Sequence, residues 1–575
     1  MNQFHQIYIC TMQKQLIECV PNFSEGLNLN VIKQITDQIE KVDGVHLLDV
    51  DPGKATNRTV VTFVGEPDAV VDAAFVAIKK AAELIDMSKH KGEHPRMGAT
   101  DVCPMIPVAN ISMEETAEYA KKLAKRVGEN LEIPIYLYEE AQDNKDRSNL
   151  SIIRGGEYEG FSKKIEKSEW KPDFGPAKFD ERTGVTAIGA REFLIAYNIN
   201  LNTKSTRIAN RIAFDVREAG RVKREGNPIS GKIVTDDKGE TVRIPGRLKQ
   251  VKAIGWFIEE YNRAQISMNL TNYKITPLHI AFDETCNSAL ERGARVTGSE
   301  LVGLIPLKAM LDAGKYFLDK QGLSSGVSES ALIDSAIHSL GLSEITEFDP
   351  KKKIIEYQLQ SIDDKKLVSM PLEALVDETA SDSPAPGGGS IAAAAAAMGV
   401  ALGTMVANLS ASKRGWEDKV EFYSDWAAKG QRVKEELLAL VDEDTRAFNG
   451  IMATFGMPKE TKAEKDSRAQ ALEDASKYAM EIPYKTMLAA AKSLPILTEM
   501  GAKGNPNSLS DVGVGALCIK TGVHGAYLNV LINASGIKDE AWANQLLAKA
   551  KELLNVTLTA CDKIIEEVST KIKAG

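Results

Sequence analysis

The sequence is poor in the features that mark secreted proteins, zinc proteins and nucleic-acid-binding proteins. Six cysteines are scattered over 575 residues, with no CxxC pair and no spacing that would build a disulfide framework or a zinc site. The formal charge is −9, so the clustered Lys and Arg that bind phosphate backbones are mostly missing. These absences exclude a disulfide scaffold and a general nucleic-acid partner. They favour a reducing compartment, which we expect to be the cytoplasm.

The N-terminus lacks a signal-peptide pattern, because no basic stretch leads into an apolar core of sufficient length. Secretion is therefore not expected, and we interpret residues 1–13 as an extension. Residues 383–412 lack charge altogether, and Gly399 and Gly403 form a GxxxG pattern of the kind that packs membrane helices. This segment is nevertheless mainly Ala and Gly and begins with a turn-forming PAPGGG, which favours a buried helix and no membrane span.

The composition is otherwise that of a globular protein, with 43% hydrophobic and 26% charged residues, and the chain is too long for one core. Strand and helix patterns alternate in the first part, and their order recurs from about Phe193. A Gly- and charge-rich excursion at 221–246 is typical of an exposed hairpin. We predict an α/β fold here, as two ferredoxin-like sandwich subdomains. The predicted strands are 16–22, 45–51, 58–65, 133–141, 193–202, 251–260 and 264–272, and the predicted helices are 24–42, 67–85, 112–130, 205–219 and 277–292.

Strand patterns vanish after a charged, aperiodic stretch at 351–366. Only helical patterns rich in Ala, Leu, Glu and Lys follow, which predicts an all-α helical bundle. The predicted helices are 372–380, 389–408, 416–455, 463–500, 509–533 and 539–573. We therefore expect four segments, namely subdomains at 1–193 and 194–359, a linker at 360–366 and a helical domain at 367–575.

One predicted loop concentrates groups that could take part in chemistry. Residues 87–108 combine His90 and His94 with several Gly and Pro residues, which favours a loop over a sheet edge. A helical metal pair of the two histidines is disfavoured, because Gly92 and Pro95 interrupt a shared helical face. Imidazole is the side chain best suited to move a proton at neutral pH. On these grounds alone, His94 is as compatible with a structural role as with a catalytic one.

In the helical part, Asp444 is the strongest candidate by pattern. Its neighbours three and four positions away are all apolar, so helical geometry places its carboxylate in a buried stripe. Desolvation would raise its pKa, which suits a group that shuttles protons, although a hydrogen-bonded structural Asp fits the pattern too. Asp442 and Glu443 have Arg446 within helical reach and are expected to form a solvated group.

Several long strings, in order, resemble one known family. LIECVPNFSEG, LLDVDPGKATNRTVVTFVG, LIDMSKHKGEHPRMGATDVCPMIPV, WKPDFGP, NINLNT and GRLKQVKAIGW resemble glutamate formimidoyltransferase over nearly all of residues 15–357. SPAPGGGSIAAAAAAMG, LVDEDTRAF and TGVHGAYLNVLIN resemble formimidoyltetrahydrofolate cyclodeaminase from about Lys366 to the end. The order of the halves is that of the formimidoyltransferase-cyclodeaminase family, and such strings are more specific than any short motif.

The resemblance implies two successive reactions of histidine degradation. The formimidoyl group passes from N-formimidoyl-L-glutamate to N5 of tetrahydrofolate, and the product cyclises to 5,10-methenyl-tetrahydrofolate with loss of ammonia. In the family pattern the catalytic histidine of the transferase corresponds to His94, and the catalytic aspartate of the cyclodeaminase corresponds to Asp444. We add Asp51, at the end of a predicted strand, as a candidate to orient the imidazole of His94; a turn-capping Asp is the simpler reading.

The family's folate-binding segment corresponds to residues whose exposed backbone and basic groups could hold a pterin or a glutamate tail, although a solvated linker fits the same residues. They are Gly175, Pro176, Ala177, Lys178, Phe179, Asp180, Glu181, Arg182, Thr183 and Gly184. The SPAPGGGS loop lacks the strand and Lys of a phosphate loop, so it is interpreted as a helix start that could receive a folate carboxylate through Gly387, Gly388 and Gly389, with Ser390 as a helix cap. Asn529 and Asn533, one helical turn apart, could face this cleft or form a satisfied core pair.

The resemblance further implies tetrahydrofolate, in polyglutamylated form, as a co-substrate, no metal, and a homo-oligomer of dimers in a larger ring. Two other readings stay open at this point. The helical half could be a methenyltetrahydrofolate cyclohydrolase, to which cyclodeaminases are similar. Alternatively, one half could be a folate-binding or assembly module without catalysis. Release of ammonia separates the first alternative, and variants of His94 and Asp444 test the second.

Overall fold

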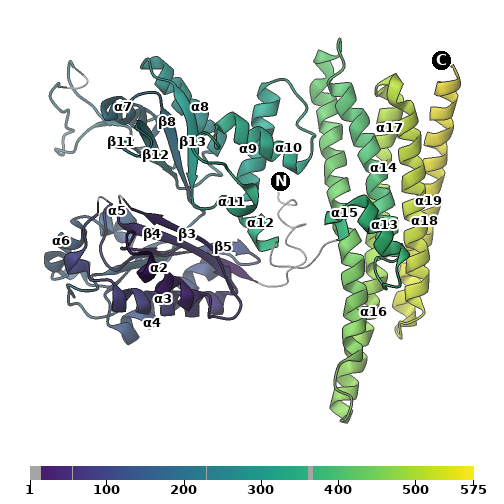
Figure 1. Ribbon diagram of the computed structural model, residues 1–575, viewed down its shortest axis with the longest axis horizontal. Helices are drawn as coiled ribbons and strands as arrows, with labels where there is room; N and C mark the ends of the chain where they lie inside the picture. Colours follow the sequence, from purple (N-terminus) through teal and green to yellow (C-terminus); the bar gives the residue numbers. More distant parts are fainter. Residues whose placement is uncertain (1–14, 55, 93, 228–229, 361–366, 575) are drawn as a thin grey trace. The chain divides into compact units, whose positions relative to one another are not determined.

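The computed structural model describes residues 15–574 except 55, 93, 228–229 and 361–366, so the predicted extension and most of the predicted linker lie outside the described residues. The chain forms two compact units, drawn in Figure 1. One comprises Met1–Met310 and Leu340–Gln360, and the other comprises Leu311–Ser339 and Ser361–Gly575. The fold is therefore a mixed α/β part with sheets and a largely helical C-terminal part.

The first sheet of the α/β unit contains seven strands in the order β1-β4-β2-β5-β7-β6, with β3 paired to β4. Three helices pack together over this sheet, with Ile17, Phe63 and Ile78 in the buried core beneath them. The strands are β1 (Leu16–Cys19), β2 (Asn22–Phe23), β3 (Val45–Gly53), β4 (Arg58–Gly65), β5 (Thr100–Ala109), β6 (Ile135–Glu139) and β7 (Thr186–Ala190), and the helices are α2 (Leu29–Ile39), α3 (Pro67–Leu84) and α4 (Met113–Leu131).

Two predictions for this sheet were wrong. The predicted helix 24–42 begins later, because Asn28 caps α2 by accepting from the amides of Asn30 and Val31. The predicted loop 87–108 contains β5, which lies in the middle of the sheet between β1 and β7. Pro104 and Pro107 disguised this strand, and Pro107 lies at a register shift where a missing amide hydrogen is tolerated. The predicted capping box of Ser112 and Glu115 is confirmed at the start of α4.

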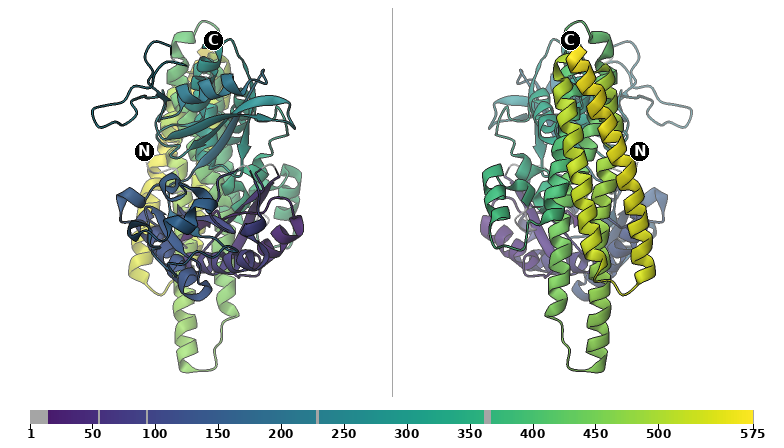
Figure 2. Two further views of the ribbon diagram at one scale, coloured as in Figure 1. Left: turned by 90° about the vertical axis from the view of Figure 1, so that its left-hand side faces the viewer. Right: turned by 90° about the vertical axis from the view of Figure 1, so that its right-hand side faces the viewer.

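The second sheet is antiparallel with the order β11-β12-β8-β13. Two helices, α7 and α8, pack together, and α7 lies against β11 and β12. The predicted hairpin at 221–246 is confirmed by the pairing of β9 with β10, and it projects at the left of Figure 2. The elements are β8 (Ile195–Leu201), α7 (Thr206–Val216), β9 (Arg221–Val222), β10 (Arg243–Ile244), β11 (Val251–Ile258), β12 (Arg263–Leu270), α8 (Leu278–Glu291) and β13 (Val296–Val302).

Helices that the sequence patterns did not separate follow β13. The second of them lies in the segment Leu311–Ser339, which belongs to the helical unit although it precedes the predicted linker. In that unit Ser325 donates its amide to Ser424 Oγ at 3.0 Å, and Asn408 Nδ2 donates to the Gly326 carbonyl at 2.9 Å. The helices are α9 (Leu307–Lys320), α10 (Glu329–Leu340), α11 (Pro350–Lys353) and α12 (Ile355–Gln360).

The predicted bundle is confirmed, and its long helices lie side by side in Figure 2. A Cβ on Gly399 of α14 would come within 2.7 Å of the Gly515 carbonyl of α18, so these helices approach backbone to backbone. The predicted helix 463–500 is broken before Pro495, which has no amide to donate. The helices are α13 (Leu372–Ala380), α14 (Gly388–Ala411), α15 (Val420–Phe455), α16 (Lys462–Ala491), α17 (Leu494–Lys503), α18 (Leu509–Ala534) and α19 (Glu540–Ala574).

Within the described residues, one helix, α14, is long and apolar enough to cross a membrane by length and composition. Within its most apolar window, with a mean hydropathy of 1.8, 61% of the residues are buried inside the protein. Buried faces of small residues are typical of a core helix, and α14 packs against both α15 and α18.

Candidate active sites

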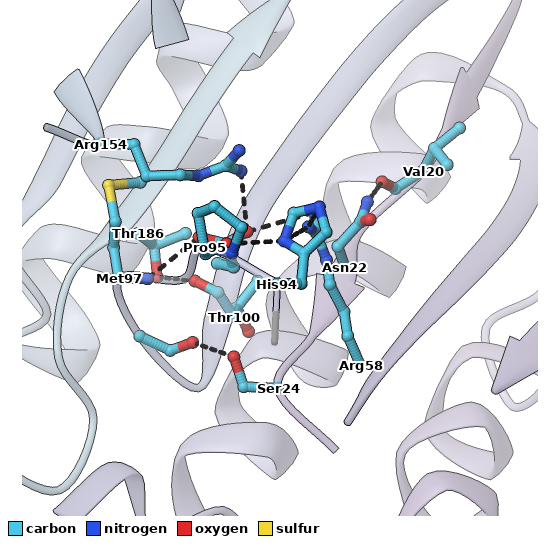
Figure 3. A network of polar contacts seen from close by, with 12 residues as sticks. Val20, Asn22, Ser24, Arg58, His94, Pro95, Met97, Thr100, Arg154 and Thr186 are labelled. Carbon is cyan, nitrogen blue, oxygen red and sulfur yellow. Dashed lines mark hydrogen bonds and ion pairs between the residues drawn. The ribbon is translucent and has the colours of Figure 1, made fainter. Parts of the chain in front are cut away.

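His94 lies in the loop that leads into β5. Its ring nitrogens contact Arg58 Nη1 at 2.5 and 2.6 Å, and Nδ1 also lies 2.7 Å from the Pro95 carbonyl oxygen (Figure 3). Burial, with the positive charge of Arg58 as the next cause, lowers the pKa of His94 to about 4. The imidazole is therefore neutral at neutral pH and keeps a lone pair.

Asp101 lies close to Arg58 and the His94 loop, and it was not predicted from the sequence. It is fully buried, its Oδ2 pairs with Arg58 Nη2 at 3.1 Å and Arg154 Nη2 at 2.8 Å, and its Oδ1 accepts the Met97 amide at 3.1 Å. Arg58 and Arg154 come from β4 and from the end of α5 (Leu150–Ile153), and they approach from opposite sides in Figure 3. A carboxylate at the start of an apolar strand was the only available signal for it.

The other histidine of the loop has different neighbours. His90 Nε2 lies 2.8 Å from the Asn57 carbonyl oxygen, and Arg96 Nε donates to His90 Nδ1 at 3.3 Å. Arg96 is in turn paired with Glu159 at 2.7 Å. His90 therefore fastens the loop, while His94 faces the Arg58 guanidinium.

The predicted folate segment, 175–184, lies against the His94 loop. Gly98 and Gly184 form an antiparallel bridge, and the Ala99 amide donates to the Thr183 carbonyl at 2.8 Å. Gly184 has φ +67° and no room for a Cβ beside the Met97 carbonyl, so only glycine fits there. The two basic residues in the segment, Lys178 and Arg182, are both exposed, and Arg182 donates to the Glu83 carbonyl at 2.5 Å. Two regions chosen separately from the sequence are thus adjacent in the structure.

Asp51 lies on β3 opposite Val60 and does not orient His94 in this structure. Among the described residues, the hydrogen bonds of His94 are those with Arg58 and Pro95, and none joins it to Asp51. The charge of Asp51 acts instead on Tyr261 of the second subdomain, whose pKa is raised to about 12 mainly by burial. The residue that contacts His94 is Arg58 of β4, which pairs with Gly53 of β3, two residues along the strand from Asp51.

The sheet face opposite the helices carries further acidic residues. Strand alternation places Glu18 and Asp49 on this face, paired with Val64 and Thr62, while Phe63 enters the core. Burial raises the pKa of Glu18 to about 8 and also raises the pKa of Asp49. The charge of Glu356 further raises the pKa of Glu18, and the charge of Lys353 lowers the pKa of Asp49. The C-terminal end of the α/β unit therefore lies near this face.

The second sheet turns a polar network away from its core. Trp256 Nε1 donates to Gln265 Oε1 at 3.0 Å, Gln265 Nε2 donates to Asn200 Oδ1 at 2.7 Å, and Tyr261 donates to Glu300 Oε1 at 3.1 Å. Because the charge of Asp51 acts on Tyr261, this network lies near the acidic face of the first sheet. Hydrogen-bonding groups of both subdomains therefore lie near the first sheet, the sheet that the His94 loop enters.

In the helical unit, Asp444 of α15 lies against the first turn of α14. Ser390 Oγ donates to Asp444 Oδ2 at 2.9 Å, and the Ser390 backbone also bonds the carboxylate. Burial is the largest cause of the raised pKa of Asp444, and the Ser390 bonds oppose it. A Cβ on Gly389 would overlap the carboxylate, and a Cβ on Gly388 would lie 3.3 Å from Asn529 Nδ2. Gly387 is the N-cap residue of α14, so Ser390 bonds Asp444 and does not cap the helix as predicted.

For the neighbours of Asp444, the predicted pairing of Arg446 with Glu443 is confirmed, but the predicted solvation of Glu443 was wrong. Glu443 is 8% exposed and is bonded by both Tyr478 and Arg446, while Asp442 Oδ1 accepts the Leu367 amide at 2.7 Å. The single apolar stripe failed as a guide because α15 packs between α14 and α16 and therefore has two buried faces. Of the two predicted asparagines, Asn529 lies beside Gly388, and Asn533 is satisfied by the Ala479 carbonyl at 2.7 Å.

Among the described residues, no group of three or more His, Cys, Asp or Glu side chains is arranged to hold a metal ion. The donors that do gather are guanidinium groups, one imidazole and single carboxylates. These groups can bind an anion and move protons.

Comparison with known proteins relates each part of the chain to one family. Residues 16–191 match the family model of the formiminotransferase domain, N-terminal subdomain, residues 196–360 match that of the formiminotransferase domain, and residues 371–552 match that of formiminotransferase-cyclodeaminase. The formimidoyltransferase-cyclodeaminase of Mus musculus is 43% identical over 559 residues, which cover 97% of this chain and 99% of the mouse protein.

Two relatives match one half each. The glutamate formimidoyltransferase of Thermoplasma acidophilum is 43% identical over 313 residues, covering 54% of this chain and 95% of that protein. The methenyltetrahydrofolate cyclohydrolase of Methylorubrum extorquens is 33% identical over 201 residues, covering 35% of this chain and 97% of that protein.

Proposed function

The chain belongs to the formimidoyltransferase-cyclodeaminase family, and from this premise we propose which residues carry out its two reactions. It is a bifunctional enzyme of histidine degradation. Its transferase part moves the formimidoyl group of N-formimidoyl-L-glutamate to N5 of tetrahydrofolate. Its cyclodeaminase part converts 5-formimidoyl-tetrahydrofolate to 5,10-methenyl-tetrahydrofolate and releases ammonia. The observation that carries the assignment is similarity to a bifunctional relative along almost the entire length of both chains.

His94 is the proposed general base of the transferase. N5 of tetrahydrofolate must lose a proton as it attacks the formimidoyl carbon, and the departing glutamate nitrogen must gain one. A neutral imidazole accepts the first proton and can return it to the second nitrogen. Support comes from its unprotonated state, its contact with Arg58, the bridge between its loop and the folate segment, and the family pattern. A positioned base contributes about 10²–10⁴-fold to such a step.

The segment 175–184 is proposed to hold tetrahydrofolate, with the polyglutamate tail reaching the exposed Lys178. Its backbone is fixed by the Gly98–Gly184 bridge and by Asp180, which accepts the amides of Arg182 and Thr183. A preorganised loop loses less entropy when it binds a ligand. Asp51 remains a proposed site residue, but in another role. Its carboxylate would contribute to the polar surface near Tyr261 of the second subdomain.

Asp444 is the proposed proton carrier of the cyclodeaminase. N10 attacks the formimidoyl carbon to close the ring, and the nitrogen that leaves as ammonia needs a proton. A carboxyl group whose pKa is raised by burial keeps its proton to a higher pH than an exposed aspartic acid does, which suits a group that gives a proton to the leaving nitrogen. The free amides at the start of α14, at Gly387, Gly388 and Gly389, are proposed to receive a folate carboxylate, supported by the positive end of the helix dipole.

A second candidate for the helical half is a methenyltetrahydrofolate cyclohydrolase, because a relative of that name matches this half. Only the cyclodeaminase releases ammonia, so the two candidates differ in a measurable product. The chain would be supplied with N-formimidoyl-L-glutamate and tetrahydrofolate, and methenyl-tetrahydrofolate absorbance and ammonia would be recorded together. Equal amounts of both products support the cyclodeaminase.

The same assay tests the two site residues. His94→Ala should stop all turnover, whereas Asp444→Asn should accumulate 5-formimidoyl-tetrahydrofolate without ammonia. A wild-type protein that forms neither product would overturn the assignment. Unchanged rates in either variant would instead indicate that the corresponding half is a binding or assembly module.

We propose that copies of the chain associate through one face of the bundle. Exposed apolar side chains of α14 and α18, two helices that pack against each other, are proposed to form this face. Met398 is 52% exposed and Leu517 is 49% exposed, although soluble monomers seldom leave such rows open. A second copy is the proposed occupant, because the spacing on α14 is close to a heptad and carries no charge. The face consists of Ile391, Met398, Met405, Leu409, Val514, Leu517, Leu528, Leu531 and Ile532.

The finer description of the fold is also a proposal. Both α/β subdomains follow the strand-helix-strand-strand-helix-strand order with the sheet order that ferredoxin-like sandwiches have, and the first adds β6 and β7. The proposed sequence limits are 1–193, 194–359 and 367–575, with the linker at 360–366. The scattered cysteines support a cytoplasmic location.

A further inference from the structure

Two buried guanidinium groups share one carboxylate beside His94. The side chains of Arg58 and Arg154 are 10% and 16% exposed, and both pair with Oδ2 of the fully buried Asp101. With a neutral imidazole next to them, one positive charge has no partner among the residues that the structure describes. An uncompensated charge is costly away from water, because its hydration is lost without an opposite charge in return. Such an arrangement is stable when an anion completes it.

Both arginines also have N–H groups that bond nothing. The Nε atoms of Arg58 and Arg154 are buried and have no hydrogen-bond partner in the described part of the chain. Among the described residues, the hydrogen bonds and ion pairs of Arg154 run only through Nη2, to Asp101. A guanidinium group presents its donors in a planar fork that matches the two oxygens of a carboxylate.

The arginines are held in place by contacts that do not use those donors. Lys164 Nζ donates to the carbonyls of Ile152, Ile153 and Gly155 at 2.6 to 2.9 Å, and so fixes the turn that carries Arg154. Asp101 fixes both guanidinium groups and, through the Met97 amide, the loop that carries His94. The site is therefore preorganised before a ligand arrives.

We propose that Arg58 and Arg154 form the subsite for the α-carboxylate of the formimidoyl donor. This inference rests on the proposed transferase function, which makes the donor a dicarboxylate. The α-carboxylate is the better candidate of the two, because only the donor nitrogen and Cα separate it from the formimidoyl carbon. That carbon must come close to the His94 ring, and Arg58 Nη1 lies 2.5 and 2.6 Å from its two nitrogens.

Binding at this subsite would also change the base. The charged groups that act on His94 are Arg58 from β4, Arg154 after α5 and Asp101 from β5, and both arginines lower its pKa. A carboxylate bound to them offsets that effect, so the imidazole becomes a stronger base once the donor is present. The acid limb of kcat should therefore lie at higher pH than the acid limb of kcat/KM, because the second reports the free enzyme.

The test compares two amides of the donor in the full-length enzyme. The wild type should lose about 10- to 100-fold in kcat/KM with the α-amide of N-formimidoyl-glutamate, the range of a lost charged hydrogen bond. Arg154→Met should show the same loss with the normal donor and little further loss with the α-amide. The γ-amide should affect the wild type and Arg154→Met equally, and the KM for tetrahydrofolate should stay unchanged.

The matched control is Arg147→Met. Arg147 is 15% exposed on its side chain and pairs one to one with Asp173 at 2.9 Å, so its charge is already compensated, and the α-amide should cost this variant as much as the wild type. Arg154→Lys, which keeps the charge, should retain part of the α-carboxylate preference if Arg154→Met fails to fold. A full α-amide penalty in folded Arg154→Met, or no penalty in the wild type, would overturn the subsite. A wild type that transfers no formimidoyl group from the normal donor would contradict the proposed function instead.

Discussion

Gly389 shows how one missing side chain shapes the helical site. Any Cβ at this position would overlap the Asp444 carboxylate, which the first turn of α14 must reach. Gly389→Ala is expected to reduce cyclodeaminase kcat/KM by at least about 100-fold, because a displaced carboxyl group loses its geometry. Transferase turnover should continue, and 5-formimidoyl-tetrahydrofolate should accumulate. Gly450→Ala on the neighbouring helix meets nothing within 4 Å and is the control.

Replacing Asp444 should raise the stability of the protein and abolish ammonia release. Burial raises its pKa, so the folded protein binds its proton more tightly than the unfolded chain does. Its contribution to stability is present at low pH and is lost as the pH rises through the raised pKa. Asp444→Asn should therefore unfold at a higher temperature than the wild type at pH 8, with a smaller difference at pH 4, while ammonia release is lost. Calorimetry at both pH values measures this, and a destabilised variant at pH 8 would contradict it.

His94 should remain active as a base below its ordinary range. Its pKa is about 4, and Arg58 contributes to that lowering. The acid limb of transferase kcat/KM should therefore lie well below pH 6.5. In Arg58→Met the limb should move to higher pH, since a positive charge has been removed. A limb near pH 6.5 in the wild type would contradict this arrangement.

At the residue scale, the sequence predicted single positions better than their partners. The family strings led to His94 and Asp444, whose roles stay predictions; the structure shows that both are partly buried and have a perturbed pKa. Asp101 was not predicted, because its partners lie on β4 and after α5, and only the folded chain brings them together. Glu443 was predicted to be solvated but is buried, because the apolar pattern of one helix does not show how many other helices pack around it.

Elements with a clear period were predicted well, and those interrupted by proline were not. The paired strands β3 and β4 and the long helices α15 and α18 follow their apolar spacing. Strand β5 escaped because its two prolines read as a loop signal, although neighbouring strands on both sides hold it in the sheet. Tertiary pairing, which local patterns do not contain, decides such segments.

Close packing of α14 on α18 sets a limit on side-chain size. Gly515 lies against the Gly399 carbonyl, so Gly515→Leu forces the helices apart or strains the backbone. We expect the thermal transition of the helical unit to fall, by the several degrees that about 2–3 kcal/mol of overpacking causes. Transferase activity should persist at moderate temperature. Gly450→Leu, which points into open space, should leave the transition unchanged.

At the scale of the whole molecule, the exposed face of α14 and α18 predicts assembly. Met398→Glu combined with Leu517→Glu places charges in the proposed contact and should dissociate the oligomer, as measured by analytical ultracentrifugation. Val556→Glu is the matched control, because Val556 is 61% exposed but lies on α19. An unchanged molecular mass in the double variant would exclude this face as the contact.

The segment Leu311–Ser339 belongs to one half of the chain by sequence and to the helical unit by its contacts. It is encoded within the transferase half, yet Ser325 and Gly326 are fastened to α14 and α15 by Ser424 and Asn408. A chain cut between residues 360 and 367 would thus still carry a segment of the helical unit on its transferase fragment. Gene truncation at that point would leave Ala427 without the backbone of Gly326 that covers it. In this chain, the contacts of the helical unit therefore begin before the proposed linker at 360–366.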